Sequence, residues 1–281
     1  MPTLTQIREG AAGDHNLLVK AVADTVNGTV VTVNALGYKI PSPDRARDAY
    51  MTKDGDTFRL ITTPTTSLQE VTLDSALPTL VNGDDIRIYF LLSPEELNDA
   101  LNEELQLNSY ETRYDITLVS GTNEYTLPAH VTSRTHVLGV IFRYSVSGSP
   151  IVEQPAPSFM LIEDDNVVTL QIINMPVDLT NLTCVVRLRK YYDSLATEAS
   201  ITTMPYNYAV KMASMAMMKK LATKYGADAV RKIFKDEMNQ SRLEYLRMKQ
   251  EHEPVAEATD LYQDFAWEGP DIPLDYLQPS W

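Results

Sequence analysis

The chain has 281 residues, 44% of them hydrophobic and 22% charged, and this length predicts more than one compact domain with a sizeable core. The 38 acidic residues outnumber the 24 basic ones, and the net charge of −14 disfavours sequence-general binding to a nucleic-acid backbone. A single cysteine, Cys184, excludes an intramolecular disulfide and a cysteine-rich zinc site.

Residues 1–92 predict a helix followed by a small β domain. Apolar residues recur at helical spacing through residues 4–26, at Leu17, Leu18, Ala21, Val22 and Val26. Alternating apolar and polar residues then predict strands over 29–33, 57–62, 70–73 and 86–91. Turn sequences at 53–56 and 82–85 separate these strands. We expect a unit of four or five strands at ordinary strand length.

The segment Ser93-Pro94-Glu95-Glu96 has the pattern of a helix start. Ser93 can accept from the backbone N–H of Glu96, and the Glu96 side chain can return to the N–H of Ser93. Pro94 is well suited to the first helical position, where no N–H is needed. We expect a helix from here to about Asn108.

A second β region follows from residue 115. Strands are predicted over 116–119, 125–127, 137–144, 159–162, 167–173 and 182–192, and the acidic stretch 163–166 predicts a hairpin turn. In the last strand, one face is predicted to carry Leu182, Cys184, Val186, Leu188 and Lys190. Cys184 is therefore expected to be a buried, inert thiol.

Two helices are predicted after this β region. Pro205 begins a run whose apolar face is formed by Tyr208, Met212, Met215, Ala216 and Leu221. Gly226 is placed to end this helix, and a second helix from Asp228 carries Val230, Ile233, Phe234, Met238, Tyr245 and Met248. Two helices joined at a glycine predict an antiparallel hairpin.

Charge is distributed unevenly along the C-terminal part of the chain. Residues 211–250 contain ten basic and four acidic residues, whereas residues 251–281 contain eight acidic residues and no basic one. The basic helical stretch is interpreted as a solvated face, a phosphate-binding face or a receptor for an acidic partner, which the chain itself could supply. We predict three domains, 1–92, 93–250 and 251–281.

The acidic segment 251–281 also holds both tryptophans of the protein. Prolines at 270, 273 and 279 prevent a helix, but disordered segments are normally poor in aromatic residues. Burying the aromatics would return about as much free energy as ordering the backbone costs. We therefore predict an extended arm that becomes ordered on another chain, through Tyr262, Phe265, Trp267, Tyr276 and Trp281.

No residue pattern predicts an enzyme. The sequence has no glycine-rich phosphate or dinucleotide loop, no Gly-x-Ser-x-Gly and no His-Glu-x-x-His. We expect no catalytic residue, no cofactor and no metal site. The first nine residues lack a basic region followed by an apolar stretch, and no apolar run approaches the ~18 residues of a membrane span, so neither secretion nor a membrane partner is expected.

The order of the predicted elements resembles that of a known family. A capped helix over 93–108 precedes a β stretch with Glu-Tyr-Thr-Leu-Pro-Ala at 124–129, and later strands end in Val-Arg-Leu-Arg-Lys-Tyr-Tyr at 186–192. A Met/Ala-rich helix pair then closes the core. Over about 93–250 this order resembles the head-to-tail connector (portal adaptor) proteins of tailed bacteriophages, the group that includes the tail tubular protein A of short-tailed phages.

This resemblance implies an α+β fold: a helix, an antiparallel β domain and a C-terminal helical hairpin, here with an extra N-terminal β domain and an extended C-terminal arm. It also implies a virion protein, made in the host cytoplasm, that forms a homo-oligomeric ring, typically of twelve copies, in the head-tail neck. Its partners would be the portal protein and a downstream tail or nozzle protein, with genomic DNA passing through the lumen during ejection without sequence-specific binding. The arm 251–281 would clamp the portal. Residues 28–92 have no counterpart in the family core.

Three other functions stay open on the sequence. A tail-completion or tail-terminator protein would bind the tail tube instead of the portal. A carbohydrate- or receptor-binding β module is a second alternative, although such sites usually display aromatics on a sheet face and both tryptophans lie in the arm. A DNA-packaging or DNA-binding accessory factor is the third, and the net charge disfavours it.

Overall fold

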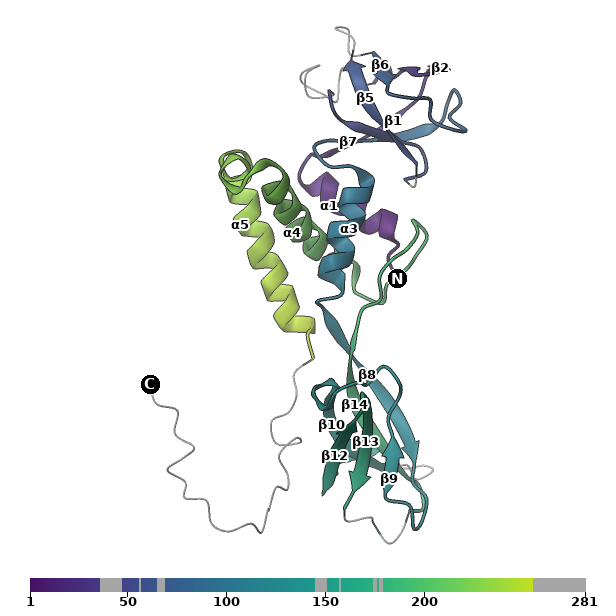
Figure 1. The fold of residues 1–281 in the computed structure, drawn as a ribbon, viewed down its shortest axis with the longest axis vertical. Helices are drawn as coiled ribbons and strands as arrows, with labels where there is room; N and C mark the ends of the chain where they lie inside the picture. The colour runs from purple at the N-terminus through teal and green to yellow at the C-terminus, as the bar shows by residue number, and fades with distance from the viewer. Residues whose placement is uncertain are drawn as a thin grey trace. The chain divides into compact units, whose positions relative to one another are not determined.

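The computed structural model describes residues 1–35, 47–55, 57–64, 69–144, 151–156, 158–173, 176 and 179–254 (Figure 1). The described chain forms two compact units. Unit 1 comprises Met1–Asn108 and Tyr191–Glu253, and unit 2 comprises Ser109–Lys190 together with Pro254. Both helices and antiparallel sheets are present, which confirms the predicted α+β class. The units group residues by contact, and the three sequence-based domains stay a prediction.

Unit 1 contains a seven-stranded antiparallel sheet with the order β1-β7-β4-β5-β6-β3-β2. Its strands are β1 (Leu18–Val22), β2 (Thr25–Asn27), β3 (Val30–Thr32), β4 (Tyr50–Thr52), β5 (Phe58–Pro64), β6 (Glu70–Leu73) and β7 (Asp85–Tyr89). The two edge strands, β1 and β2, follow each other in the chain with only residues 23 and 24 between them, so the sheet curls back toward itself. Its inner face is a continuous apolar core that includes Val31, Met51, Ile61, Val71 and Ile88.

The predicted helix over residues 4–26 was wrong beyond Asp14. Helix α1 spans only Leu4–Asp14, capped by the Thr3 hydroxyl, and Asn16 then adopts a left-handed φ of 56° that no helix continues through. Residues 18–22 pair with β7 as strand β1. Over so short a stretch, the spacing of their apolar residues is compatible with a helix and with a strand. Hydrogen bonding to β7 stabilises the strand. The β unit therefore has seven strands instead of the four or five expected.

In the described part of unit 1 the helices are α1, α3 (Pro94–Leu105), α4 (Tyr206–Tyr225) and α5 (Ala227–His252) (Figure 1). The predicted cap of α3 is confirmed, because Glu96 N–H donates to Ser93 Oγ at 3.0 Å and Ser93 N–H donates to the Glu96 carboxylate at 2.8 Å. Helix α4 packs against α1, α3 and α5. Gly226 (φ 87°) separates α4 from α5, as predicted for a helical hairpin. Among the described residues, no helix is both long and apolar enough to cross a membrane.

Helix α5 is interrupted at Phe234, whose φ of −122° and ψ of 28° are not helical. The predicted apolar face of this helix is therefore only partly correct. Val230 and Tyr245 are buried, but Ile233, which directly precedes the interruption, is 70% exposed. Leu243, at 68% exposure, also faces solvent.

Unit 2 consists of a four-stranded sheet, β11-β10-β14-β8, and a three-stranded sheet, β12-β13-β9. The strands are β8 (Ser109–Thr117), β9 (Glu124–Thr126), β10 (Val137–Tyr144), β11 (Val152–Pro155), β12 (Phe159–Asp164), β13 (Val167–Ile172) and β14 (Leu182–Tyr191), with a 3-10 turn at Arg134–His136. One core joins both sheets, and Leu182, Cys184, Val186 and Leu188 enter it from β14. The face predicted for this strand is confirmed.

The predicted hairpin between 159 and 173 is also confirmed, with a tighter turn than expected. Asp164 pairs with Val167, so Asp165 and Asn166 form a two-residue loop. Their φ values of 44° and 62° are those of a type I′ turn, which Asp and Asn tolerate well. Strand β11 was not predicted, because its sequence, Val-Glu-Gln-Pro, is short and all four residues are exposed.

Candidate functional site

The five aromatic residues predicted to bind a partner lie outside the described residues, namely Tyr262, Phe265, Trp267, Tyr276 and Trp281. The described chain ends at Pro254, whose carbonyl accepts a hydrogen bond of 3.1 Å from Arg189 Nη2 of β14. A candidate site must therefore be built from the surfaces of the two units, each taken separately.

A groove on unit 1 runs along α4 and the first half of α5, and we name it the α4–α5 groove. It consists of two hollows of about 390 and 690 Å³ that share Arg231, Met238 and Arg242. Met215 and Met218 of α4 line the first hollow, opposite Met238 of α5. Ala222 and Ala227 also line it, and their small side chains leave room beside the methionines. The groove thus has a thioether floor, which adapts readily to aromatic groups.

The rim of the α4–α5 groove is basic. Lys219 is 67% exposed and lies 3.7 Å from Glu104, a long and weak ion pair. Arg231 and Arg242 are exposed, and neither forms an ion pair with another described residue. Asp228 is the single acidic residue lining either hollow. The groove can therefore attract an acidic ligand without first breaking an internal pair.

Other basic residues of the helix pair are neutralised within unit 1. Lys211 lies 3.1 Å from Asp14 and 3.0 Å from Glu244, and Lys224 lies 2.8 Å from Glu96. Burial opposes the charge of Lys224, but the bond to Glu96 outweighs it and raises the pKa of Lys224. The basic residues predicted on the helix pair thus fall into two groups. Lys211 and Lys224 form ion pairs within unit 1, whereas the basic residues of the groove rim can contact a partner.

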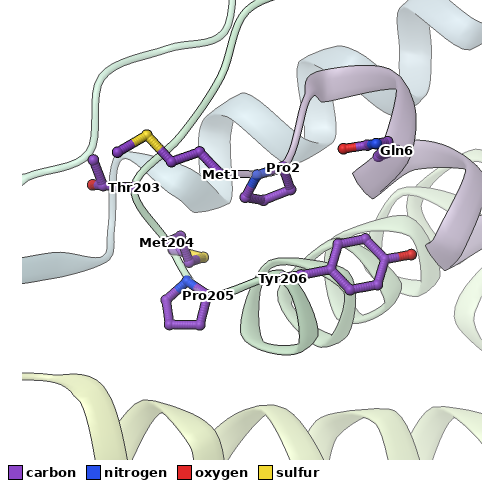
Figure 2. Close-up of a pocket in the computed structure, with 7 residues that line it drawn as sticks. All are labelled: Met1, Pro2, Gln6, Thr203, Met204, Pro205 and Tyr206. Atoms are coloured by element: carbon purple, nitrogen blue, oxygen red, sulfur yellow. The ribbon is translucent and has the colours of Figure 1, made fainter.

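A separate hollow of about 510 Å³ lies beside the N-terminus of unit 1 (Figure 2). Met1, Pro2 and Gln6 line one side, and Thr203, Met204, Pro205 and Tyr206 line the other. A backbone bridge from Thr3 to Ile201 and a 3.2 Å bond from Thr202 N–H to the Pro2 carbonyl hold the two sides together. This hollow is mostly apolar and lacks a charged side chain, so it offers little selectivity.

A buried ion pair fixes the segment that approaches this hollow. Arg8 is 1% exposed, and its guanidinium is bound by both oxygens of Glu198, by Tyr89 Oη at 3.0 Å and by Asn98 Oδ1 at 2.9 Å. Burial opposes the charge, but Tyr89 and Glu198 together raise the pKa of Arg8 above its usual value. Gly55 (φ 92°) closes over the pair, because a Cβ there would stand 2.5 Å from Arg8 Nη2. Each of the three guanidinium nitrogens donates at least one hydrogen bond, so the pair is structural.

A polar cluster of buried residues lies where α3 ends. Asn108 Oδ1 accepts from Tyr208 Oη at 2.6 Å. The single hydroxyl proton of Tyr245 is shared between Asn108 Oδ1 at 3.1 Å and Glu104 Oε1 at 3.0 Å. Burial raises the pKa of both tyrosines, so they remain donors at neutral pH. Helices α3, α4 and α5 are thereby joined at one residue, Asn108.

The outer face of β12 and β13 in unit 2 mixes apolar and polar side chains. Alternate residues of these strands enter the core. On the opposite face Met160, Ile162 and Val167 are exposed, and they pair with Gln171, Thr169 and Asp164 of the neighbouring strand. The apolar groups of this face are aliphatic residues and a methionine, not the aromatic platform expected of a sugar-binding sheet.

The sequence identified the basic residues of the helix pair and placed Met215 and Met238 on apolar helix faces. Met238 does pack, partly buried, against the core of unit 1, and both methionines also line the groove. A signal was available: six of the eleven methionines fall within residues 211–250, and methionine is over-used at adaptable binding surfaces. The groove could not be deduced from periodicity alone, because it depends on how α4 packs against α5.

No family model and no curated protein matches this chain. Among solved structures, the chain is similar to a protein in the neck of an empty GTA particle computed with C6 symmetry. The sequences are 12% identical, and the TM-score is 0.23. The match covers 47% of this chain and 64% of that one, so this chain spans less than two thirds of its length.

Proposed function

We propose that this protein is a non-enzymatic structural adaptor in the neck of a tailed-phage or phage-like virion. Copies of the chain form a ring, of about twelve subunits in the family that it resembles, between the portal and the tail. DNA passes through the ring without sequence-specific binding, and the acidic arm 251–281 contacts the portal. The protein uses no cofactor, metal or membrane.

One observation carries this proposal: unit 2 is inserted between the helix α3 and the helix pair α4–α5. The chain leaves unit 1 after Asn108 and returns at Tyr191, and Tyr192 N–H donates 3.2 Å to the Asn108 carbonyl. Tyr208 of α4 and Tyr245 of α5 bind the Asn108 side chain. The helix pair thus closes on the helix that precedes the β unit, which is the order of elements in the connector family.

The exposed surfaces favour this function over a glycan-binding module. The outer face of β12 and β13 carries aliphatic groups and the α4–α5 groove carries methionines, and both are more typical of protein contacts than of sugar stacking. The net charge of −14 suits a conduit that must release DNA.

Binding to purified portal rings tests the proposal. The full chain is expected to bind, and a chain ending at Pro254 is expected to fold and to lose portal binding. The truncation point matters, because His252 stacks on Tyr208 with ring centroids 5.2 Å apart and must be kept to preserve α5. Far-UV circular dichroism of the truncated chain provides the folding control.

Undiminished portal binding by the truncated chain would remove the arm's proposed role. Binding to tail components instead of the portal would identify a tail-completion or terminator protein. Salt-dependent binding to random duplex DNA would favour the DNA-binding alternative.

A further inference from the structure

We propose that the α4–α5 groove of one copy receives residues 260–268 of the arm of a second copy. This inference rests on the proposed function in one respect, because a ring is what supplies the second copy. The occupant is a named segment of this chain, Asp260-Leu-Tyr-Gln-Asp-Phe-Ala-Trp-Glu268, which lies outside the described residues.

Charge complementarity is the first argument. The segment 260–268 contains Asp260, Asp264 and Glu268 and no basic residue. The groove rim contains Lys219, Arg231 and Arg242, with Asp228 as its one acidic lining residue. Arg231 and Arg242 lack ion-pair partners within the described chain, so three carboxylates would meet cations that are not already neutralised.

The apolar groups also match. In the segment, Phe265 follows Asp264 and Trp267 precedes Glu268, so each of these rings has a carboxylate beside it. In the groove, Met238 lies between Arg231 and Arg242, so a thioether has a guanidinium on either side along α5. Aromatic rings bind thioether sulfur and guanidinium planes favourably. Hollows of about 390 and 690 Å³ have room for these side chains.

Chain length lets the arm reach a groove of its own chain as well as that of a second copy. Met238 is 16 residues before Pro254, or ~24 Å along a helix. Phe265 is 11 residues after Pro254, which spans up to ~36–40 Å when fully extended. The ring of the proposed function supplies a neighbouring copy to each subunit and so favours the groove of that copy. The concentration dependence and the mixing experiment below separate the two.

Tryptophan fluorescence isolates the arm, because both tryptophans of the protein, Trp267 and Trp281, lie in it. In a Trp281→Phe chain, Trp267 is the single reporter. Its emission is expected to shift to the blue as the protein concentration rises, and to revert on dilution. Reversing two rim charges, Arg231→Glu with Arg242→Glu, is expected to raise the midpoint concentration about tenfold or more. Adding Asp264→Lys and Glu268→Lys to the chain with the reversed rim should restore the original midpoint concentration.

Arg247→Glu is the matched control, since Arg247 is an exposed arginine on α5 that does not line the groove. Arg247→Glu is expected to leave the midpoint concentration of the blue shift unchanged.

A mixing experiment with full-length chains then tests exchange of the arm between copies. One chain carries the reversed rim and Trp267 alone. The other has an intact groove, an arm with Asp260, Asp264 and Glu268 changed to lysine, and phenylalanine at both tryptophan positions. A blue shift on mixing is the expected result.

Three outcomes would overturn the inference: a blue shift that is independent of concentration, a shift that survives the rim reversal, or no shift on mixing. The portal is absent from these assays, so the neck function and the groove are tested separately. Exchange of the arm without portal binding would support the inference about the groove and contradict the proposed function. Portal binding without exchange would support the proposed function and contradict the inference about the groove.

Discussion

Replacing Glu198 with alanine would leave the Arg8 guanidinium charged and buried without its carboxylate. Arg8 is 1% exposed and Glu198 12% exposed, so little water can take the place of the lost oxygens. Breaking a buried pair by removing one partner costs roughly 3–5 kcal/mol. Because Tyr89 and Asn98 continue to accept from Arg8 at 3.0 and 2.9 Å, we expect the lower end of that range, about 3 kcal/mol.

Urea unfolding followed by circular dichroism measures this loss, and hydrogen exchange in α1 assigns it to unit 1. Glu251→Ala is the control, because Glu251 pairs with Arg247 at 3.4 Å on the surface and should cost about 0.5 kcal/mol or less. A Glu198→Ala loss below about 1 kcal/mol would refute the reasoning, since it would mean that Arg8 is solvated or neutral in the folded protein.

Three further predictions follow from individual residues. Ser93→Ala removes the acceptor for Glu96 N–H and is expected to cost about 1 kcal/mol in thermal or urea unfolding, whereas Ser93→Asp should largely preserve the cap. Burial lowers the pKa of His15 below its usual 6.5, so the unfolded chain takes up a proton at a higher pH than the folded one. The free energy of unfolding is therefore highest above pH 6.5 and falls as the pH drops. His15→Leu should flatten this fall in unfolding free energy, measured between pH 7.5 and about 5. Burial raises the pKa of Cys184 to about 12, so a thiol reagent at pH 8 should label it only after unfolding; rapid labelling of the native chain would contradict its burial.

Local signals in the sequence predicted much of the fold. The Ser93 cap, the break at Gly226 and strand 137–144 each depend on residues within a few positions of one another, and the structure has all three. The alternation through β14 correctly assigned Cys184 to the core. Where two periods fitted, as over residues 18–22, the outcome depended on a partner strand about 65 residues away, which no local pattern reveals.

The candidate groove could be predicted only in part. Its charges were visible in the sequence, but its floor depends on the packing of α4 against α5. The Arg8–Glu198 pair joins residues 190 positions apart, and the Asn108 cluster joins three helices. Such contacts follow from the tertiary fold and carry no signature in either segment alone.

The most direct test of the neck assignment is the mass of the purified full chain, alone and mixed with portal rings, by native mass spectrometry. Twelve 31.5-kDa chains would give a particle of about 380 kDa, and we expect such a closed ring on the portal. A chain that stays monomeric at every concentration, with portal present or absent, would contradict the account.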